Sequence, residues 1–515
     1  MGKPFPMRSS VKLVASTEPA AAAGVPDPET PFRILVLGDF RGRGERGLAK
    51  GEPGTIGEPV RIDRDNFEEV MARLGVGVGL TAGGDGLTRV ALTFAEIDDF
   101  HPDQIYARAE VFRALRRTRT QLSDPATFAE AAAALVGGPG AEARNVGPAV
   151  GAPPAAPQPA PADLFDQIVR STARSEGAGG RSGDGWDAFL AKITAPHRVA
   201  RAEPRQAELV ASVDSATGDL MRAILHDPEF QALEAAWRGL LFLSRRLETG
   251  PQLELFLAHV TRSELADDLR GERDLRATAT YKSLIEPSVG MSGGQPWGVI
   301  VGNMTFGPDP GDTALLGRTA GLARLAGAPF LAAADPRILG CTSLAATPDS
   351  DDWRVPPDGA SRDAWQALRA HGDAAYLGLA LPRFLLRLPY TRGDYAIDSF
   401  DFEELCGDPG HEAYLWGNPA FALAEILGQA FSHEGWGMRP GDDTTVDDLP
   451  LHTHTVKGVT EVVPCGEAWL SDRAADVVLD RGLMPFLTKK GRDVIRLVQF
   501  QSIAEPPCAL AGRWS

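Results

Sequence analysis

The spacing of apolar residues predicts alternating strands and helices along much of the chain. Residues 32–37 and 253–260 are short apolar runs bounded by polar or turn-forming residues, which is typical of buried strands. Between residues 228 and 243 the apolar positions recur at steps of three and four, so they share one face of a helix. Asp227, followed by Pro228, has the pattern of a helix N-cap with proline in the first turn.

Other periodic segments complete the prediction of an α/β fold of the mixed α+β kind. Strands are predicted at residues 59–63, 89–94, 293–306 and 329–334. Helices are predicted at residues 66–76, at residues 312–326, and from Pro102 through Leu115.

One stretch lacks the composition for a core. Residues 137–161 are almost entirely glycine, alanine, proline and polar residues, with two valines as the only larger apolar side chains. Such a sequence predicts an extended, partly polyproline linker. Residues 1–31 form a separate N-terminal arm, with weak strand-like alternation at residues 10–15.

A short amphipathic helix is predicted directly after the linker, within residues 162–185. Its polar sequence carries an apolar stripe made of Leu164, Phe165, Ile168 and Val169, and a glycine-rich segment follows it. Lying between flexible segments, the helix fits a ligand for the groove of a partner protein, but a helix docked on its own chain fits the pattern equally well.

Composition narrows the classes of partner. The 515 residues, 43% of them hydrophobic, suffice for two to four domains with a sizeable core. The formal net charge of -17 argues against nucleic acid and anionic membranes as partners, although residues 113–119 form a local basic patch. Four widely spaced cysteines without a CxxC pair, no secretory signal and no run of 18 apolar residues predict a cytoplasmic protein that does not insert into membranes.

Particular strings beyond the linker resemble a known family. LHDPEFQALEAAWRGL at residues 225–240 resembles the signature of the large subunit of the type VI secretion contractile sheath. Further matching strings follow in order, namely GGQPWGVIVGN, AGAPFLAAADP, YLGLALPRFLLRLPY, FDFEE, YLWGNPAFALAEIL and LPLHTHTVKGVTEVVPCGEAWLSDR. Residues 186–515 are therefore expected to form a segment like the large subunit.

Residues 32–136 resemble the small subunit of the same sheath. GDF at residues 38–40, IDRDNF at residues 62–67 and DDFHPD at residues 98–103 occur in the family's order and at plausible spacing. The linker lies where one resemblance ends and the other begins, so the chain looks like a fusion of two subunits that co-fold into one sheath protomer.

The resemblance implies a bacterial structural protein that is not an enzyme and uses no cofactor. Its implied partners are other sheath subunits or copies of itself, an inner tube protein, baseplate components and an AAA+ ATPase that dismantles contracted sheath. That ATPase would recognise the helix carrying Leu164, Phe165, Ile168 and Val169. A linking strand between protomers would include Met7, Val11 and Leu13.

Two departures from the family pattern leave a second hypothesis open. The large subunit usually continues well beyond the FQSIAEPP region, whereas this sequence ends at Ser515, and GDY of many relatives reads Gly302-Asn303-Met304. The chain is therefore either a sheath protomer or a non-polymerising, assembly-limiting homologue such as a cap or adaptor.

Two glycine motifs suggest enzymes, but their surroundings disagree. Residues 42–47 fit GxGxxG after a strand, yet the glycine- and proline-rich sequence that follows opposes the helix a dinucleotide site needs. Residues 290–294 fit GxSxG, yet a strand follows Ser292, where a nucleophile elbow requires a helix. A soluble hydrolase or nucleotide enzyme is the remote alternative, and no catalytic residue is assigned.

Metal and carboxylate candidates have simpler explanations. His452 and His454, with Cys465 or His433, lack the spacing of a standard zinc site and fit half-exposed strand histidines. The carboxylates at residues 442–448 lack EF-hand spacing and predict an acidic, solvated loop. The pairs at residues 267–268 and 403–404 fit helix faces or caps, so no metal site is assigned.

Overall fold

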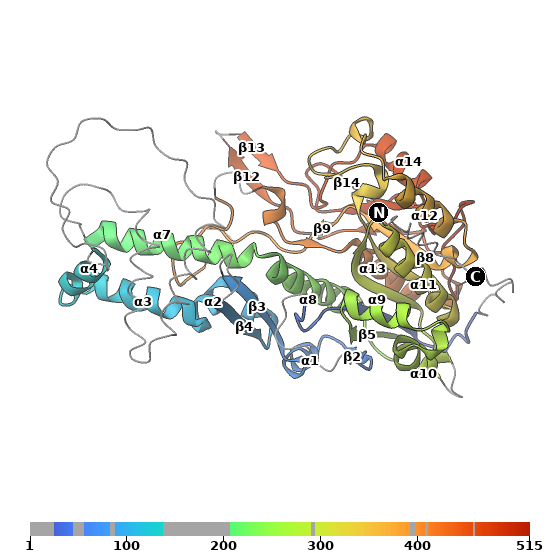
Figure 1. Cartoon of the computed structure of the whole chain (residues 1–515), viewed down its shortest axis with the longest axis horizontal. Helices are drawn as coiled ribbons and strands as arrows, with labels where there is room; N and C mark the ends of the chain where they lie inside the picture. The colour runs from blue at the N-terminus through green and yellow to red at the C-terminus, as the bar shows by residue number, and fades with distance from the viewer. Residues whose placement is uncertain are drawn as a thin grey trace, which may run out of the picture.

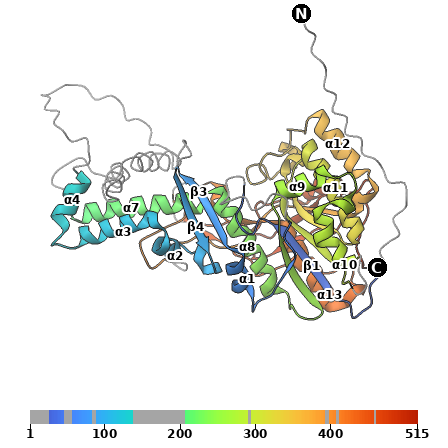
Figure 2. The ribbon, with the colours of Figure 1, turned by 60° about the horizontal axis from the view of Figure 1, so that its bottom comes forward.

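The computed structural model describes residues 25–44, 56–82, 88–136, 206–289, 294–391, 397–406, 410–456 and 459–514. Within these ranges the chain has the predicted mixed α/β fold. Its outline is elongated in both Figure 1 and Figure 2, with a sheet and its covering helices, here called the body, at one end. Helices α3 (Glu110–Ser123), α4 (Phe128–Val136) and α7 (Gln206–Leu225), here called the arm, project from the other end.

A nine-stranded sheet runs through the body in the order β11-β15-β14-β8-β7-β6-β1-β5-β2. Its six consecutive strands from β14 to β5 are parallel, and β2, β11 and β15 are antiparallel to their neighbours. The bounds are β1 (Phe32–Gly38), β2 (Val60–Ile62), β5 (Leu253–His259), β6 (Val299–Phe306), β7 (Phe330–Ala334), β8 (Leu377–Leu381), β11 (Thr445–Val446), β14 (Met484–Thr488) and β15 (Ile495–Leu497).

Strand β1 lies in the middle of this sheet, although it belongs to the N-terminal part of the chain. It pairs in parallel with β5 on one side and β6 on the other, so that Ile34 lies opposite both Leu255 and Val299. All three of these side chains are fully buried. The segments before and after residues 137–161 therefore share one hydrogen-bonded sheet.

Helices cover both faces of the sheet, as alternating side chains of β1 require. Ile34 and Val36 join the apolar core under α8 and α13, whereas Leu35 and Leu37 join the core under α9, α11 and α12. The body helices are α8 (Pro228–Arg246), α9 (Arg262–Gly271), α10 (Glu286–Val289), α11 (Pro310–Ala326), α12 (Gly359–Arg369), α13 (Pro419–Glu434) and α14 (Asp472–Asp480).

The arm also joins the two parts of the chain. Helix α3 packs along α7, with Arg119 Nε donating to Asp214 Oδ1 at 2.6 Å and Gln206 Nε2 donating to the Leu122 carbonyl at 2.7 Å. An antiparallel hairpin of β3 (Val76–Ala82) and β4 (Thr88–Phe94) lies between arm and body in Figure 1. Helices α1 (Phe67–Leu74) and α2 (Pro102–Arg108) flank this hairpin in the sequence.

Short elements complete the described chain. Two further two-stranded sheets pair β9 (Phe384–Leu385) with β10 (Trp416–Gly417), and β12 (Thr453–Val456) with β13 (Val459–Val462). A π-helix lies at Tyr281–Ile285. The 3-10 helices are Ile97–Phe100, Leu275–Ala277, Pro336–Leu339, Ser350–Asp352, Gly372–Tyr376, His411–Ala413 and Gly435–Gly437. None of the helices in the described ranges has the length and apolar character needed to span a bilayer.

Most elements predicted within the described ranges are present. Strands β8, β11, β14 and β15 were not predicted, and two further differences have a local cause. The helix expected from Pro102 through Leu115 is broken at Ala109, whose extended backbone (ψ 129°) ends α2 and starts α3. Strand β3 was not predicted, because glycines alternate with Val76, Val78 and Leu80 and weaken the strand signal. The buried face of β3 is formed by these three apolar residues.

Candidate functional site

Helix α8 is the element on which both halves of the chain converge. Asp227 caps it as predicted, accepting hydrogen bonds from the backbone N–H groups of Glu229 and Phe230. The fully buried Trp237 packs edge-on against Phe40 and Phe67 and donates its indole N–H to the Phe40 carbonyl at 2.9 Å. The N-terminal half therefore supplies both the aromatic neighbours and the hydrogen-bond acceptor of this tryptophan.

A second aromatic cluster joins the first turn of α8 to the β3–β4 hairpin. Phe94 and Phe100 stack with ring centroids 4.1 Å apart, and Phe230 meets both of them edge-on. Phe100 and Phe230 are fully buried. The DDFHPD string, which contains Phe100, is therefore part of the core shared by the two halves.

Helix α8 also contributes a residue, Glu234, to a buried ionic network. The Arg387 guanidinium donates to both carboxylates of Glu234 and Glu404, at distances of 2.7 to 3.3 Å. Glu234 and Glu404 are 0% and 1% exposed and Arg387 is 9% exposed. Buried charges are tolerated where they are paired and hydrogen-bonded in this way.

The ion pairs shift the pKa values of Glu234 and Arg387 towards their charged forms. Burial alone raises the pKa of Glu234, but Arg387 and Arg238 outweigh burial and leave that pKa below its usual value. Burial alone lowers the pKa of Arg387, but Glu234 and Glu404 outweigh burial and leave it well above its usual value. Glu404 was expected on a helix face or cap. It lies instead in a non-helical segment and accepts hydrogen bonds from Arg387 and from the Tyr390 backbone at 2.8 Å.

The segment that carries Glu404 is also hydrogen-bonded to α2 and to the C-terminal end of α7. Asp103, from the DDFHPD string, accepts hydrogen bonds from the backbone N–H groups of Asp398 and Ser399 at 3.0 and 2.9 Å. Arg222, near the end of α7, donates to the Glu403 carbonyl at 2.9 Å. Asp103 of the DDFHPD string is thus bonded to the two residues directly before the FDFEE string, hundreds of residues away in the sequence.

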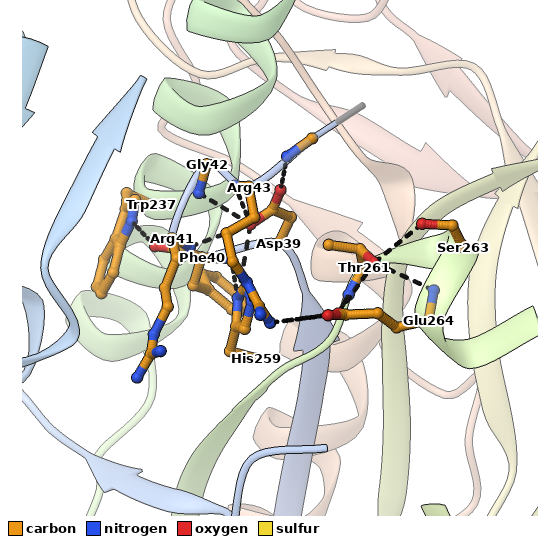
Figure 3. A network of polar contacts seen from close by, with 11 residues as sticks. Asp39, Phe40, Arg41, Gly42, Arg43, Trp237, His259, Thr261, Ser263 and Glu264 are labelled. Carbon is orange, nitrogen blue, oxygen red and sulfur yellow. Dashed lines mark hydrogen bonds and ion pairs between the residues drawn. The ribbon is translucent and has the colours of Figure 1, made fainter. Parts of the chain in front are cut away.

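The loop after β1 forms a further contact between the halves (Figure 3). The Asp39 carboxylate accepts hydrogen bonds from four consecutive backbone N–H groups of the loop, those of residues 41 to 44, at 2.7 to 3.2 Å. Gly42 has a φ of +72°, and a Cβ there would lie 2.1 Å from the Gly77 carbonyl oxygen. The GDF string and the following glycine are therefore needed for the shape of this loop.

The same loop contacts His259, at the end of β5. Arg43 Nε lies 2.6 Å from His259 Nε2, and Arg43 also pairs with Glu264 of α9 at 3.2 Å, as Figure 3 shows. Burial, together with the charges of Arg43 and Arg41, lowers the pKa of His259 to about 3. The imidazole is therefore neutral at physiological pH, and Arg43 occupies the nitrogen that a general base would need.

This geometry bears on the nucleotide alternative raised by residues 42–47. Four successive N–H groups are the kind of nest that binds phosphate, but here the Asp39 carboxylate fills it. The next helix in the described part of the chain is α1, which starts only at Phe67. Ser292, the candidate nucleophile, lies outside the described residues.

The histidine and cysteine candidates for a metal site are placed differently from a zinc centre. His452 precedes β12 and its Nδ1 lies 3.0 Å from the Tyr414 hydroxyl. Cys465 is buried against the carbonyls of Arg492 and Val494, and burial raises the pKa of its thiol to about 11. A protonated thiol at that position is a poor ligand.

A different group, made of His411, Glu412 and Glu467, brings possible ligand atoms within 4.8 Å of one another. Arg383 already pairs with both of its carboxylates, because one guanidinium nitrogen lies 2.7 Å from Glu467 Oε1 and 2.9 Å from Glu412 Oε1. The sequence analysis did not single out this group, although Arg383 and Glu467 lie in strings that carry the resemblance. For Arg383, as for Arg387, the available signal was a charge inside the otherwise apolar string YLGLALPRFLLRLPY, whereas the string that holds Glu467 is of mixed polarity and gave no such signal.

The residues assigned to recognition cannot be placed. Met7, Val11 and Leu13 of the linking strand, and Leu164, Phe165, Ile168 and Val169 of the ATPase-recognition helix, lie outside the described residues.

Comparison with known proteins supports the resemblance on both sides of residues 137–161. The sequence model of VipB, described as the EvpB/VC_A0108 tail sheath N-terminal domain, matches residues 207–504. The type VI secretion system VipA model, described as VipA, VC_A0107 or Hcp2, matches residues 17–135. The type VI secretion system sheath protein TssC1 of Pseudomonas aeruginosa is 32% identical over 306 residues, which are 58% of this chain and 61% of that relative. Because the VipB match spans more than half of the sequence, the chain belongs to the VipB tail sheath family, and it carries a VipA-like segment in the same polypeptide.

Proposed function

We propose that the chain is a structural component of a type VI secretion contractile sheath, in which one polypeptide supplies both the small and the large subunit of a protomer. The observation that carries this proposal is the position of β1 between β5 and β6, since a VipA-like strand completes the sheet of a VipB-like body. In this role the protomers stack around an inner tube, and contraction of the array propels the tube.

The role needs no bond-making step. The polar clusters described above have structural roles: Arg387 pairs with Glu234 and Glu404 inside the second half of the chain, and Arg43 of the first half contacts His259 of the second. If the remote hydrolase alternative were right, Ser292→Ala would abolish an esterase or peptidase activity of the purified protein without altering its unfolding temperature.

Strand addition between neighbouring copies is the proposed route of assembly. The described part of the chain contains an isolated hairpin, β12–β13, whose two strands pair only with each other. Isolated two-stranded hairpins are marginal by themselves and offer open edges to another strand. The proposed donor is the N-terminal segment, residues 1–31, which includes Met7, Val11 and Leu13.

Electron microscopy of the purified protein tests the assembly proposal. Long hollow tubes are expected for a sheath protomer, with or without co-expressed inner tube protein. Discrete small particles in both preparations would favour the assembly-limiting homologue instead. Replacing Val11 with proline, which removes a backbone N–H, should shorten or abolish tubes without altering the circular dichroism of the body.

We further propose that residues 162–185 are recognised by an AAA+ ATPase of the disassembly class, through Leu164, Phe165, Ile168 and Val169. Phe165→Asp and Ile168→Asp should abolish capture of the chain by this ATPase in a pull-down. Val355→Asp, at an exposed apolar residue of the body, is the matched control and should leave capture intact. Unchanged capture of both stripe variants would contradict the assignment. Baseplate components and an inner tube protein complete the proposed partners.

A further inference from the structure

Helix α13 carries a carboxylate in an otherwise apolar, buried position. Every residue from Pro419 to Gly428 is buried, and Glu425 among them is only 5% exposed. Its Oε2 atom is buried and has no hydrogen-bond partner. An isolated buried carboxylate is costly when it is ionised, so its charge state must matter to whatever packs against it.

The cation nearest to Glu425 is Arg246, in the last turn of α8, and this cation is shared. Its NH1 atom lies 3.8 Å from Glu425 Oε1 and 3.7 Å from Asp447 Oδ1. Its NH2 atom donates to the backbone carbonyls of Asp447 and Asp448. Arg246 therefore holds the residues that follow β11 through two carbonyls and one carboxylate.

Strand β11 is the outermost strand on its side of the nine-stranded sheet. It is only two residues long, and it covers the outer edge of β15. The Leu497 N–H donates to the Thr444 carbonyl at 2.9 Å, and the Leu449 N–H donates to the Asp493 carbonyl at 3.0 Å. So short an edge strand depends on contacts at its ends, of which the Arg246 contact is one.

Ionisation of Glu425 would weaken that contact in two ways. A charged Glu425 competes with Asp447 and the two carbonyls for the single guanidinium of Arg246. It also repels Asp447 and Asp443, the acidic groups that face it from the β11 side. On its own helix it faces the neutral Gln429, and the side chains of the sheet beneath α13 are apolar.

The titration range of this group is physiological. Burial, opposed by Arg246 and reinforced by Asp447 and Asp443, raises the pKa of Glu425 to about 7. The Glu425 carboxyl is therefore protonated at mildly acidic pH while β11 stays paired with β15. As pH rises through 7, this proton is lost more readily when the β11 segment has moved away, so rising pH favours opening.

We propose that Glu425 and Arg246 form a proton-controlled latch on edge strand β11, closed when Glu425 is neutral and released when it is charged. Release leaves the outer edge of β15 unpaired.

Hydrogen exchange of the full-length protein, measured by mass spectrometry between pH 6.5 and 8, tests the latch. The reporters are peptides that contain the Leu449 and Leu497 amides. After correction for the intrinsic pH dependence of exchange, their rates should rise about three- to fourfold over this range, as a group with a closed-state pKa of about 7 requires. In Glu425→Gln, which is neutral at every pH, the rates should stay at the low-pH level.

Glu434→Gln is the matched control, because Glu434 lies at the exposed end of the same helix. This variant should keep the full rise. Arg246→Met should exchange fast at both ends of the range, since it lacks the cation. An equal rise in Glu425→Gln and wild type, or no rise in wild type, would overturn the proposal.

Discussion

The two halves of the chain meet both in the body and in the arm, and the two meetings are built differently. In the body, β1 of the first half is hydrogen-bonded on both sides by strands of the second half, and the network around Arg387, which lies entirely within the second half, is at most 9% exposed. In the arm, α3 and α7 pair as two helices, with an ion pair whose Arg119 side chain is 39% exposed. The same kinds of contact therefore differ in burial, and burial decides how much free energy depends on each of them.

Removing the central cation of the body should have the largest effect. Arg387→Met leaves Glu234 and Glu404 buried without their shared partner, so we expect a loss of about 3–5 kcal/mol in the free energy of unfolding. Urea denaturation followed by tryptophan fluorescence measures this loss. A change below about 1 kcal/mol would show that the body network is no stronger than the arm pair.

The lowered pKa of Glu467 predicts that the stability of the body depends on pH. Burial raises the pKa of Glu467, but the His411 imidazole 3.5 Å away and the hydrogen-bonded Arg383 guanidinium outweigh burial and lower that pKa to about 2. Because the pKa is lowered on folding, the stabilisation is present above pH 4.5 and is lost as pH falls towards 2. Glu467→Gln should therefore cost about 2–3 kcal/mol at pH 6, with a smaller difference from wild type at pH 3. Urea midpoints at the two pH values give the comparison, and an equal difference at both would contradict it.

Replacing one glycine of the body and one glycine of the arm with alanine should change stability in opposite directions. A Cβ at Gly239 of α8 would lie 2.4 Å from the Phe421 ring, so Gly239→Ala should destabilise the body by about 1–3 kcal/mol. A Cβ at Gly218 of α7 would meet only the movable Arg222 guanidinium, at 3.3 Å. Gly218→Ala should therefore stabilise the arm by up to about 1 kcal/mol through helix propensity. Thermal unfolding temperatures decide the signs.

The smallest effect is expected for the arm ion pair. Arg119→Met removes the contact with Asp214 but leaves that carboxylate in reach of water, so the expected loss is about 0.2–1 kcal/mol. The measurement is the same urea titration as for Arg387→Met. A loss as large as that of Arg387→Met would remove the distinction between the regions.

Local patterns in the sequence were enough to predict α8, its Asp227 cap and most strands of the body, because periodicity and capping act over a few residues. The insertion of β1 between β5 and β6 was not predictable in this way, since pairing partners leave no local signal. The roles of Arg387 and Glu404 were missed for the same reason, because the partners of each charge lie elsewhere in the sequence. The Ala109 break lacked a proline or glycine to mark it.

The central position of β1 has a consequence for how the protein is made. Phe40 and His259, which hold the end of β1 to β5, are 219 residues apart in the sequence. During translation the first strand leaves the ribosome long before either neighbour exists, and so distant a pairing is slow to form. The nascent N-terminal half must wait with both edges of β1 unpaired until β5 and β6 have been synthesised. Because one messenger encodes both halves, every finished molecule also carries them in equal number.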